Sequence, residues 1–151
     1  MNDLSAQNTD RKKWMSLLAK APEGRTAALL DIATARPGFD WLRAPEVGSV
    51  MVRGRMGGTG DAFNMGEMTV TRCALKLGCG TVGHGYVQGR RKACAEAAAL
   101  IDALMQTQAA PRIQAEVLDP LTQETKARQT SRADKAAATK VDFFTMSRGE
   151  D

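Results

Sequence analysis

The chain has 151 residues, 43% of them apolar and only 5% aromatic, with a formal net charge of +4. This length suits one compact domain whose core is built mainly from Leu, Val, Met and Ala. The mild basic excess favours anionic partners but falls short of the dense Lys/Arg tracts of a dedicated nucleic-acid binder. Three cysteines without a Cys-x-x-Cys pair argue against a secreted disulfide framework. Because no apolar run resembles a signal peptide or a membrane span, we expect a soluble, cytoplasmic protein without a membrane partner.

The N-terminal part of the chain has a helical pattern. Residues 1–9 lack apolar periodicity, and we expect them to form a disordered terminus. From Asp10, which would serve as an N-cap, apolar residues recur at helical spacing as far as Ala21. Pro22 ends this helix and starts a second one, which Pro37 and the glycine after it end. The pattern predicts an N-terminal helical hairpin.

The middle of the chain has the pattern of strands. Three segments are extended or alternate between two faces, and glycines separate them: Val47–Arg55, Glu67–Lys76 and Thr81–Gln88. Gly78 and Gly80 mark a hairpin turn between the last two. These signals predict an antiparallel β-meander from Glu46 to Gly89.

Helical patterns return after the meander. Arg90–Gln108 has a continuous apolar stripe, with Asp102 away from its centre. Ile113–Leu118 has the composition of a short strand. Asp119 and the proline after it would cap and open a polar helix over Leu121–Lys140, which needs a partner surface because few of its residues can anchor it.

The C-terminal segment adds a second docking signal. Phe143 and Phe144 lie in a short apolar tail after the polar helix. We therefore expect residues 111–151 to form a partner-docking helix and tail, with the tail bound either on this chain's core or on a neighbouring subunit. The predicted fold is one α+β domain over residues 1–151, in which helices pack on an antiparallel meander.

A glycine-rich segment between the first two strands is a candidate oxyanion site. Arg53 and Arg55 could bind phosphate oxygens through two N–H groups each, and free backbone N–H groups at Gly57 and Gly58 could add to them. No Gly-Lys-Ser/Thr follows, so this is not a Walker A loop. The structural alternative is a wide hairpin loop in which the glycines serve turn geometry alone.

Two further features could bind anions or carry protons. Arg90 and Arg91 stand where the last strand meets a helix, and the N–H groups of a first helical turn favour phosphate. His84 is the only histidine; it is a weak candidate catalytic residue for proton transfer, or simply a half-buried polar side chain. No closely spaced His/Cys/Asp/Glu set predicts a metal site, and no carboxylate pair predicts general acid–base chemistry.

Two long motifs resemble a known family. Residues 53–73 (RGRMGGTGDAFNMGEMTVTRC) and 83–90 (GHGYVQGR) are similar to the G-subunit family, PhnG, of bacterial carbon–phosphorus lyase. Residues 14–19 and 141–150 resemble the same family, so that the resemblance covers nearly all of the chain from about residue 11.

The resemblance implies a subunit of a larger complex. That complex transfers methylphosphonate to the ribose C1 of ATP, releases adenine and forms α-D-ribose 1-methylphosphonate 5-triphosphate in phosphonate catabolism. The implied partners are the H, I, J and L subunits, with ATP and an alkylphosphonate as substrates of the complex. The iron–sulfur cluster and S-adenosylmethionine are expected on another subunit, and no cofactor is expected on this chain. The family provides no catalytic residue to carry over.

The sequence leaves three interpretations open. The chain is a non-catalytic but essential subunit of such a transferase complex, inactive when isolated. Alternatively it completes a composite active site with His84 or with Arg53 and Arg55. The third interpretation is a basic nucleic-acid- or nucleotide-binding module with no role in phosphonate chemistry. It is disfavoured because Tyr86 is the only tyrosine and stacking platforms need several aromatic side chains.

Overall fold

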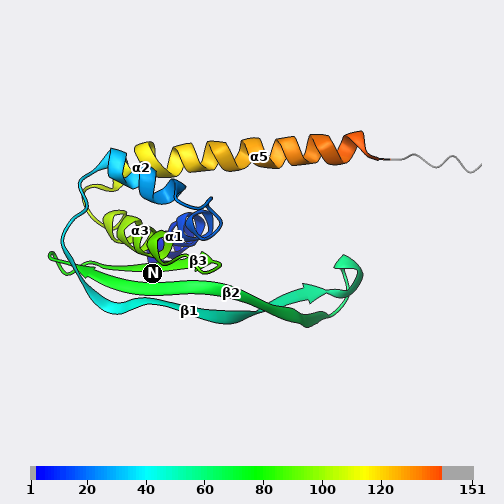
Figure 1. The fold of residues 1–151 in the computed structure, drawn as a ribbon, viewed down its shortest axis with the longest axis horizontal. Coiled ribbons are helices and arrows are strands. Elements are labelled where there is room, and N and C mark those ends of the chain that lie inside the picture. The colour runs from blue at the N-terminus through cyan, green and yellow to red at the C-terminus, as the bar shows by residue number, and fades with distance from the viewer. Residues whose placement is uncertain (1–2, 141–151) are drawn as a thin grey trace, which may run out of the picture.

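The structure is a computed structural model that describes the backbone of residues 3–140 and the side chains of residues 8–140. A three-stranded antiparallel sheet, in the order β1-β2-β3, has helices on one face (Figure 1). The elements in chain order are α1 (Asp3–Ala19), α2 (Arg25–Ala33), β1 (Phe39–Arg55), β2 (Ala62–Leu77), β3 (Val82–Gln88), α3 (Lys92–Leu104), α4 (Ala110–Ile113), a π-helical turn η2 (Gln114–Leu118) and α5 (Asp119–Ala138). The predicted α+β class, helical hairpin, meander and C-terminal helix are confirmed.

The core lies between the sheet and α3. Alternate residues of β2 and β3 are buried on the helix side of the sheet, as expected for strands with one covered face. The alanine-rich α3 is buried on nearly all sides because α1, α2 and the sheet pack around it (Figure 1). Small side chains let these elements approach closely, and Leu75, Leu100 and Ile101 fill the space that is left.

Glycines in β3 set the distance between β3 and α3. A Cβ at Gly83 would overlap the carbonyl oxygen of Ala99, and one at Gly85 would overlap that of Ala95. Both obstacles are backbone atoms, which cannot rotate away as a side chain can.

We expect Gly85→Ala to destabilise the protein by about 1–3 kcal/mol, because overpacking forces the helix and the strand apart. Gly48→Ala is the matched control, since a Cβ there meets nothing within 4 Å. Urea unfolding of the two variants measures the difference in the free energy of unfolding. Equal stability of the two would contradict the packing described for β3 and α3.

The helix boundaries correct three predictions. Ile113–Leu118 is helical and not a strand, since Ile113, Val117 and Leu121 recur at i, i+4 spacing and are all buried against the core. Asp119 does not cap α5, because helical backbone continues into α5 from η2. Asp10 does not cap a helix either: α1 already begins at Asp3, within the stretch expected to be disordered.

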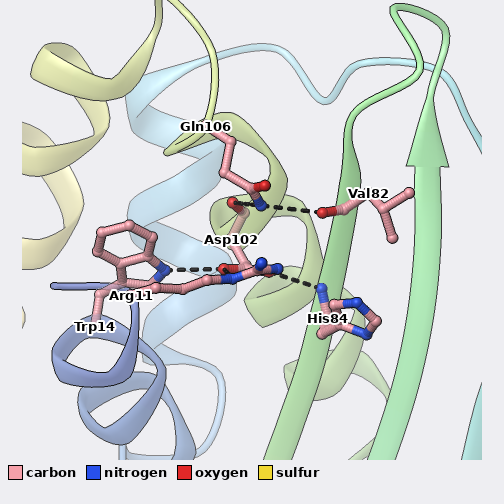
Figure 2. A network of polar contacts seen from close by, with 6 residues as sticks. All are labelled: Arg11, Trp14, Val82, His84, Asp102 and Gln106. Atoms are coloured by element: carbon pink, nitrogen blue, oxygen red, sulfur yellow. Dashed lines mark hydrogen bonds and ion pairs between the residues drawn. The ribbon is translucent and has the colours of Figure 1, made fainter. Parts of the chain in front are cut away.

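A buried carboxylate binds the outer edge of β3 (Figure 2). Asp102 of α3 is fully buried, although the sequence pattern placed it away from the apolar stripe. Its Oδ2 accepts a hydrogen bond of 2.9 Å from the backbone N–H of His84, and the Nε1–H of Trp14 donates to Oδ1 at 2.9 Å. The Arg11 guanidinium binds both carboxylate oxygens, at 3.0 and 2.6 Å. A single side chain therefore fastens α1 to α3 and satisfies a backbone donor on the sheet edge.

Gln106 completes this edge. Its Nε2 donates to the carbonyl oxygens of Val82, at 3.0 Å, and Asp102, at 2.8 Å. An exposed strand edge is a template for pairing with another chain, and Asp102 and Gln106 together bind one N–H and one carbonyl on the edge of β3. In contrast, among the described residues no hydrogen bond is made to the backbone of β1 from outside the sheet.

A two-stranded arm projects beyond the body of the protein. β3 pairs with β2 only from Val70 onward, whereas β1 and β2 stay paired as far as Arg55 and Ala62. Residues 49–69, here called the arm, therefore extend past β3 without a third strand (Figure 1). α5 leaves the body on the helix side of the sheet and projects in the same direction. Within residues 3–140 no helix is long and apolar enough to cross a membrane. The predicted tail, with Phe143 and Phe144, lies outside the described residues.

Candidate functional site at the tip of the arm

The tip of the arm is a tight glycine-rich turn. A short 3₁₀ turn (Met56–Gly58) joins β1 to β2, with Gly57 and Gly58 at φ 59° and 83°. This left-handed backbone favours glycine, and no atom lies within 4 Å of where their Cβ atoms would be. The N–H of Gly60 donates to the carbonyl of Met56 at 2.8 Å and closes the turn. The glycines therefore serve turn geometry and also leave the backbone open on the outside.

Two arginines border a hollow beside this turn. A cavity of about 550 Å³ is lined by Arg53, Gly54, Arg55, Gly58 and Ala62. Arg55 donates from Nη1 to the carbonyl of Gly60 at 3.1 Å, which positions its guanidinium group against the turn. Two guanidinium groups near one hollow provide donors for phosphoryl or phosphonyl oxygens. The structure thus brings together Arg53, Arg55 and Gly58, with Gly57 in the same turn.

Gly54 has a packing reason of its own. A Cβ at this position would overlap the side chain of Met65, which crosses Gly54 from the opposite strand. The pairing register shifts by one residue here, since Val52 pairs with Gly66 and Arg53 with Asn64. Such a bulge re-aims side chains near the end of a hairpin.

The other predicted arginines lie elsewhere. The N–H of Gly89 binds the carbonyl of Thr69, so Arg90 and Arg91 are at the base of the arm. Arg55 is opposite Ala62, on the order of 20 Å further along β2 at ~3.3 Å per residue. The two pairs of arginines therefore lie at opposite ends of the arm and do not form one site.

The side chain of Arg91 makes structural hydrogen bonds to the backbone. Its Nε donates to the carbonyl of Gln88 at 2.7 Å and its Nη1 to the carbonyl of Ala21 at 2.9 Å. Its backbone N–H donates to Thr71 Oγ1 at 2.9 Å, and that hydroxyl donates to the carbonyl of Gly89 at 2.6 Å. Arg91 thus ties the strand-to-helix junction to the loop after α1. Arg90 is exposed and remains a candidate on its own.

His84 stands on the face of the sheet that the helices leave uncovered. Its side chain is exposed and its backbone belongs to the edge network of Asp102. On the same face Arg72 donates from Nε to Glu46 Oε1 at 2.7 Å, so that this carboxylate is already paired with a cation. No carboxylate is recorded in contact with the His84 side chain among the described residues, and no acid–base pair includes it there.

The cysteines differ in exposure and in pKa. Burial raises the pKa of the Cys73 thiol to about 11. The Cys79 thiol is exposed in the turn between β2 and β3, and a hydrogen bond with the Thr81 hydroxyl at 3.3 Å lowers its pKa. No three His, Cys, Asp or Glu side chains within the described part of the chain gather as a metal site.

We expect iodoacetamide at pH 8 to alkylate Cys79 of the folded protein well before Cys73 and Cys94. The thiolate is the reactive form, and only Cys79 combines exposure with a lowered pKa. Peptide mass spectrometry before and after unfolding in urea measures the order of labelling. Labelling of Cys73 at a comparable rate in the folded protein would contradict its burial.

Two structural features of this region were not predicted from the sequence. β1 and β2 stay paired as far as Arg55 and Ala62. The glycines therefore occupy the end of a long arm and not a loop beside β3. The arm also exposes Met51, Phe63 and Met65. One face of this part of β1 carries Ser49, Met51 and Arg53. Because two of these three side chains are polar, the sequence contained a signal that no core lies beneath them.

Known proteins resemble the chain over nearly its whole length. The model of the family described as "Phosphonate metabolism protein PhnG" matches residues 9–149. A relative from Rhizobium meliloti (strain 1021), named alpha-D-ribose 1-methylphosphonate 5-triphosphate synthase subunit PhnG, is 46% identical over 142 residues. The match covers 93% of this chain and 90% of the relative. Agreement of this extent includes the arm, its glycine-rich tip and α5, and the chain belongs to the PhnG family of phosphonate metabolism proteins.

Proposed function

We propose that this chain is a subunit of an α-D-ribose 1-methylphosphonate 5-triphosphate synthase complex. The observation that carries the proposal is the end-to-end similarity to a relative with that name. In the reaction, an oxygen of methylphosphonate forms a bond to the ribose C1 of ATP while the bond from C1 to adenine breaks. Adenine leaves with a proton and the triphosphate is retained.

The chain contributes to this transferase as a supporting subunit. The described residues offer one exposed histidine and scattered carboxylates, and bond cleavage of this kind needs a positioned acid for the leaving adenine. We infer that the partner subunits complete the active site and that the isolated chain is inactive. The H, I, J and L subunits are the proposed partners, and the complex acts on ATP and an alkylphosphonate in the cytoplasm. An iron–sulfur cluster and S-adenosylmethionine would belong to another subunit.

The tip of the arm is the proposed contact to the substrate anions. Arg53 and Arg55 would donate to triphosphate or phosphonate oxygens, and Gly57 and Gly58 allow a ligand to approach the backbone closely. Arg90, which lies apart from the tip, is at most a secondary contact. Such a site is incomplete on one chain, since the hollow is widely open to solvent.

Affinity purification tests the proposed subunit role. The chain, tagged at its N-terminus, would be isolated from its own host grown with methylphosphonate as the sole phosphorus source. We expect it to carry the other synthase subunits in fixed ratio on size-exclusion chromatography. Recovery of the tagged chain as a free monomer, from cells that contain the other subunits, would contradict the proposal.

A further inference from the structure

The arm is not stable as an isolated element. Residues 49–69 form a two-stranded hairpin, and such hairpins are marginal in water without a third strand or a helix packed on them. Met51, Met65 and Met56 are 53%, 64% and 74% exposed. Methionine is flexible and is used at surfaces that adapt to a partner. These observations indicate that another protein covers the arm.

The second half of α5, residues 126–138, here called the free half, likewise has no buried side chain that anchors it. Leu121 is the only fully buried side chain of α5, and it lies before this half begins. Four basic residues stand here against one acidic residue: Lys126, Arg128, Arg132 and Lys135 against Asp134. None of the four forms an ion pair with another described residue. A polar helix of this kind is stabilised by a surface of opposite charge.

The arm and α5 face the same space. Met51 lies before the bulge, and in register it continues the side on which Thr71 is buried beneath the helices. α5 lies on that helix side and projects in the direction of the arm (Figure 1). At the base of the arm, Met51 is therefore on the side of the sheet where α5 lies.

A groove lies beside the start of the free half of α5. It has a volume of about 700 Å³ between α1 and the first part of α5, and its apolar lining includes Trp14, Leu17 and Met105. Gln129 of α5 lines the same groove. Ala133 is one turn further along the helix and lies on the same face of α5 as Gln129. The groove thus provides an apolar site between α1 and α5, next to the free half of α5.

We propose that the arm and the free half of α5 enclose one partner protein, an acidic lobe of another subunit, with an apolar side chain anchored in the groove. This rests on the proposed function and names the surface by which the chain joins its complex. Apolar contacts hold the arm, and ion pairs hold α5. A second copy of this chain fits poorly, because it would bring two basic helices together. A nucleic acid fits poorly as well, because its charged backbone would face the exposed, apolar methionines of the arm.

Site-specific photo-cross-linking tests the enclosure. Benzoylphenylalanine replaces Met51 on the arm, Ala133 on α5 or, as a control, Ile32, which is 75% exposed on α2. In the intact complex the first two positions should cross-link to the same partner chain, at peptides rich in Asp and Glu, and Ile32 should not. Cross-links from the two positions to different chains, to a second copy of this chain, or to none in an assembled complex would overturn the proposal.

Charge reversal on α5 gives an independent test. Arg132→Glu with Lys135→Glu should weaken assembly about tenfold or more and reduce its dependence on salt, since exposed ion pairs are screened. Lys92→Glu on α3 is the control and should leave assembly unchanged. If the double variant assembled normally and instead lost binding to a DNA duplex, the basic helix would be a nucleic-acid surface. If the wild-type chain formed no complex at all, the proposed function itself would fail.

Discussion

Replacing Asp102 with alanine should lower the free energy of unfolding by about 3–5 kcal/mol, the usual effect of removing one partner from a buried ion pair. The variant leaves the Arg11 guanidinium, the Trp14 indole N–H and the backbone N–H of His84 without their acceptor. Each buried donor without an acceptor adds to the loss of stability. Urea unfolding followed by circular dichroism measures the effect.

Asp10→Ala is the matched control for this experiment. Asp10 also binds a cation, since Lys13 Nζ lies 2.8 Å from its Oδ1, but both side chains are largely exposed. An exposed pair of this kind contributes at most about 1 kcal/mol. Similar stabilities of the Asp102→Ala and Asp10→Ala variants would show that the network of Figure 2 does not hold α1 against the sheet.

The second large effect is expected at the tip of the arm. Arg53→Ala combined with Arg55→Ala should weaken binding of ATP by the assembled complex tenfold or more. Each charge-assisted hydrogen bond that is lost costs ~1.5–3 kcal/mol, and 1.4 kcal/mol corresponds to a factor of ten. Isothermal titration of the purified complex with ATP, and separately with methylphosphonate, identifies which anion the arginines contact.

Arg43→Ala is the control, because Arg43 lies on β1 far from the tip and faces Glu46 at 3.5 Å. If the double variant failed to assemble, the two arginines would be contacts to an acidic partner and not to substrate. An intact complex with unchanged affinity for both anions would contradict both roles and leave the arginines as solvated surface charge.

The elements with strong periodicity could be predicted from the sequence. The alternation in β2 and the apolar stripe of α3 each have one dominant period, and both elements are present. Ile113–Leu118 was predicted as a strand because it is short and contains Ile and Val. Tertiary packing determines the conformation of this segment, because its apolar residues at i, i+4 spacing contact the core together only when the segment is helical.

The candidate site could be predicted only in part. Arg53, Arg55 and the glycines form one hollow because they are close in sequence and share a turn. Their separation from Arg90 depends on how far β1 and β2 remain paired, which local propensity does not determine. Asp102 could not be recognised as central because Arg11, its charged partner, is 91 residues away along the chain.

Reconstitution of the synthase from purified subunits tests the central claim most directly. ATP and methylphosphonate are incubated with the complete set of subunits, with the set lacking this chain, and with this chain alone, and phosphorus NMR follows the ribose 1-phosphonate product. We predict product from the complete set, little or none when this chain is omitted, and none from the chain alone. Undiminished product without the chain, or turnover by the chain alone, would contradict its role as an essential supporting subunit.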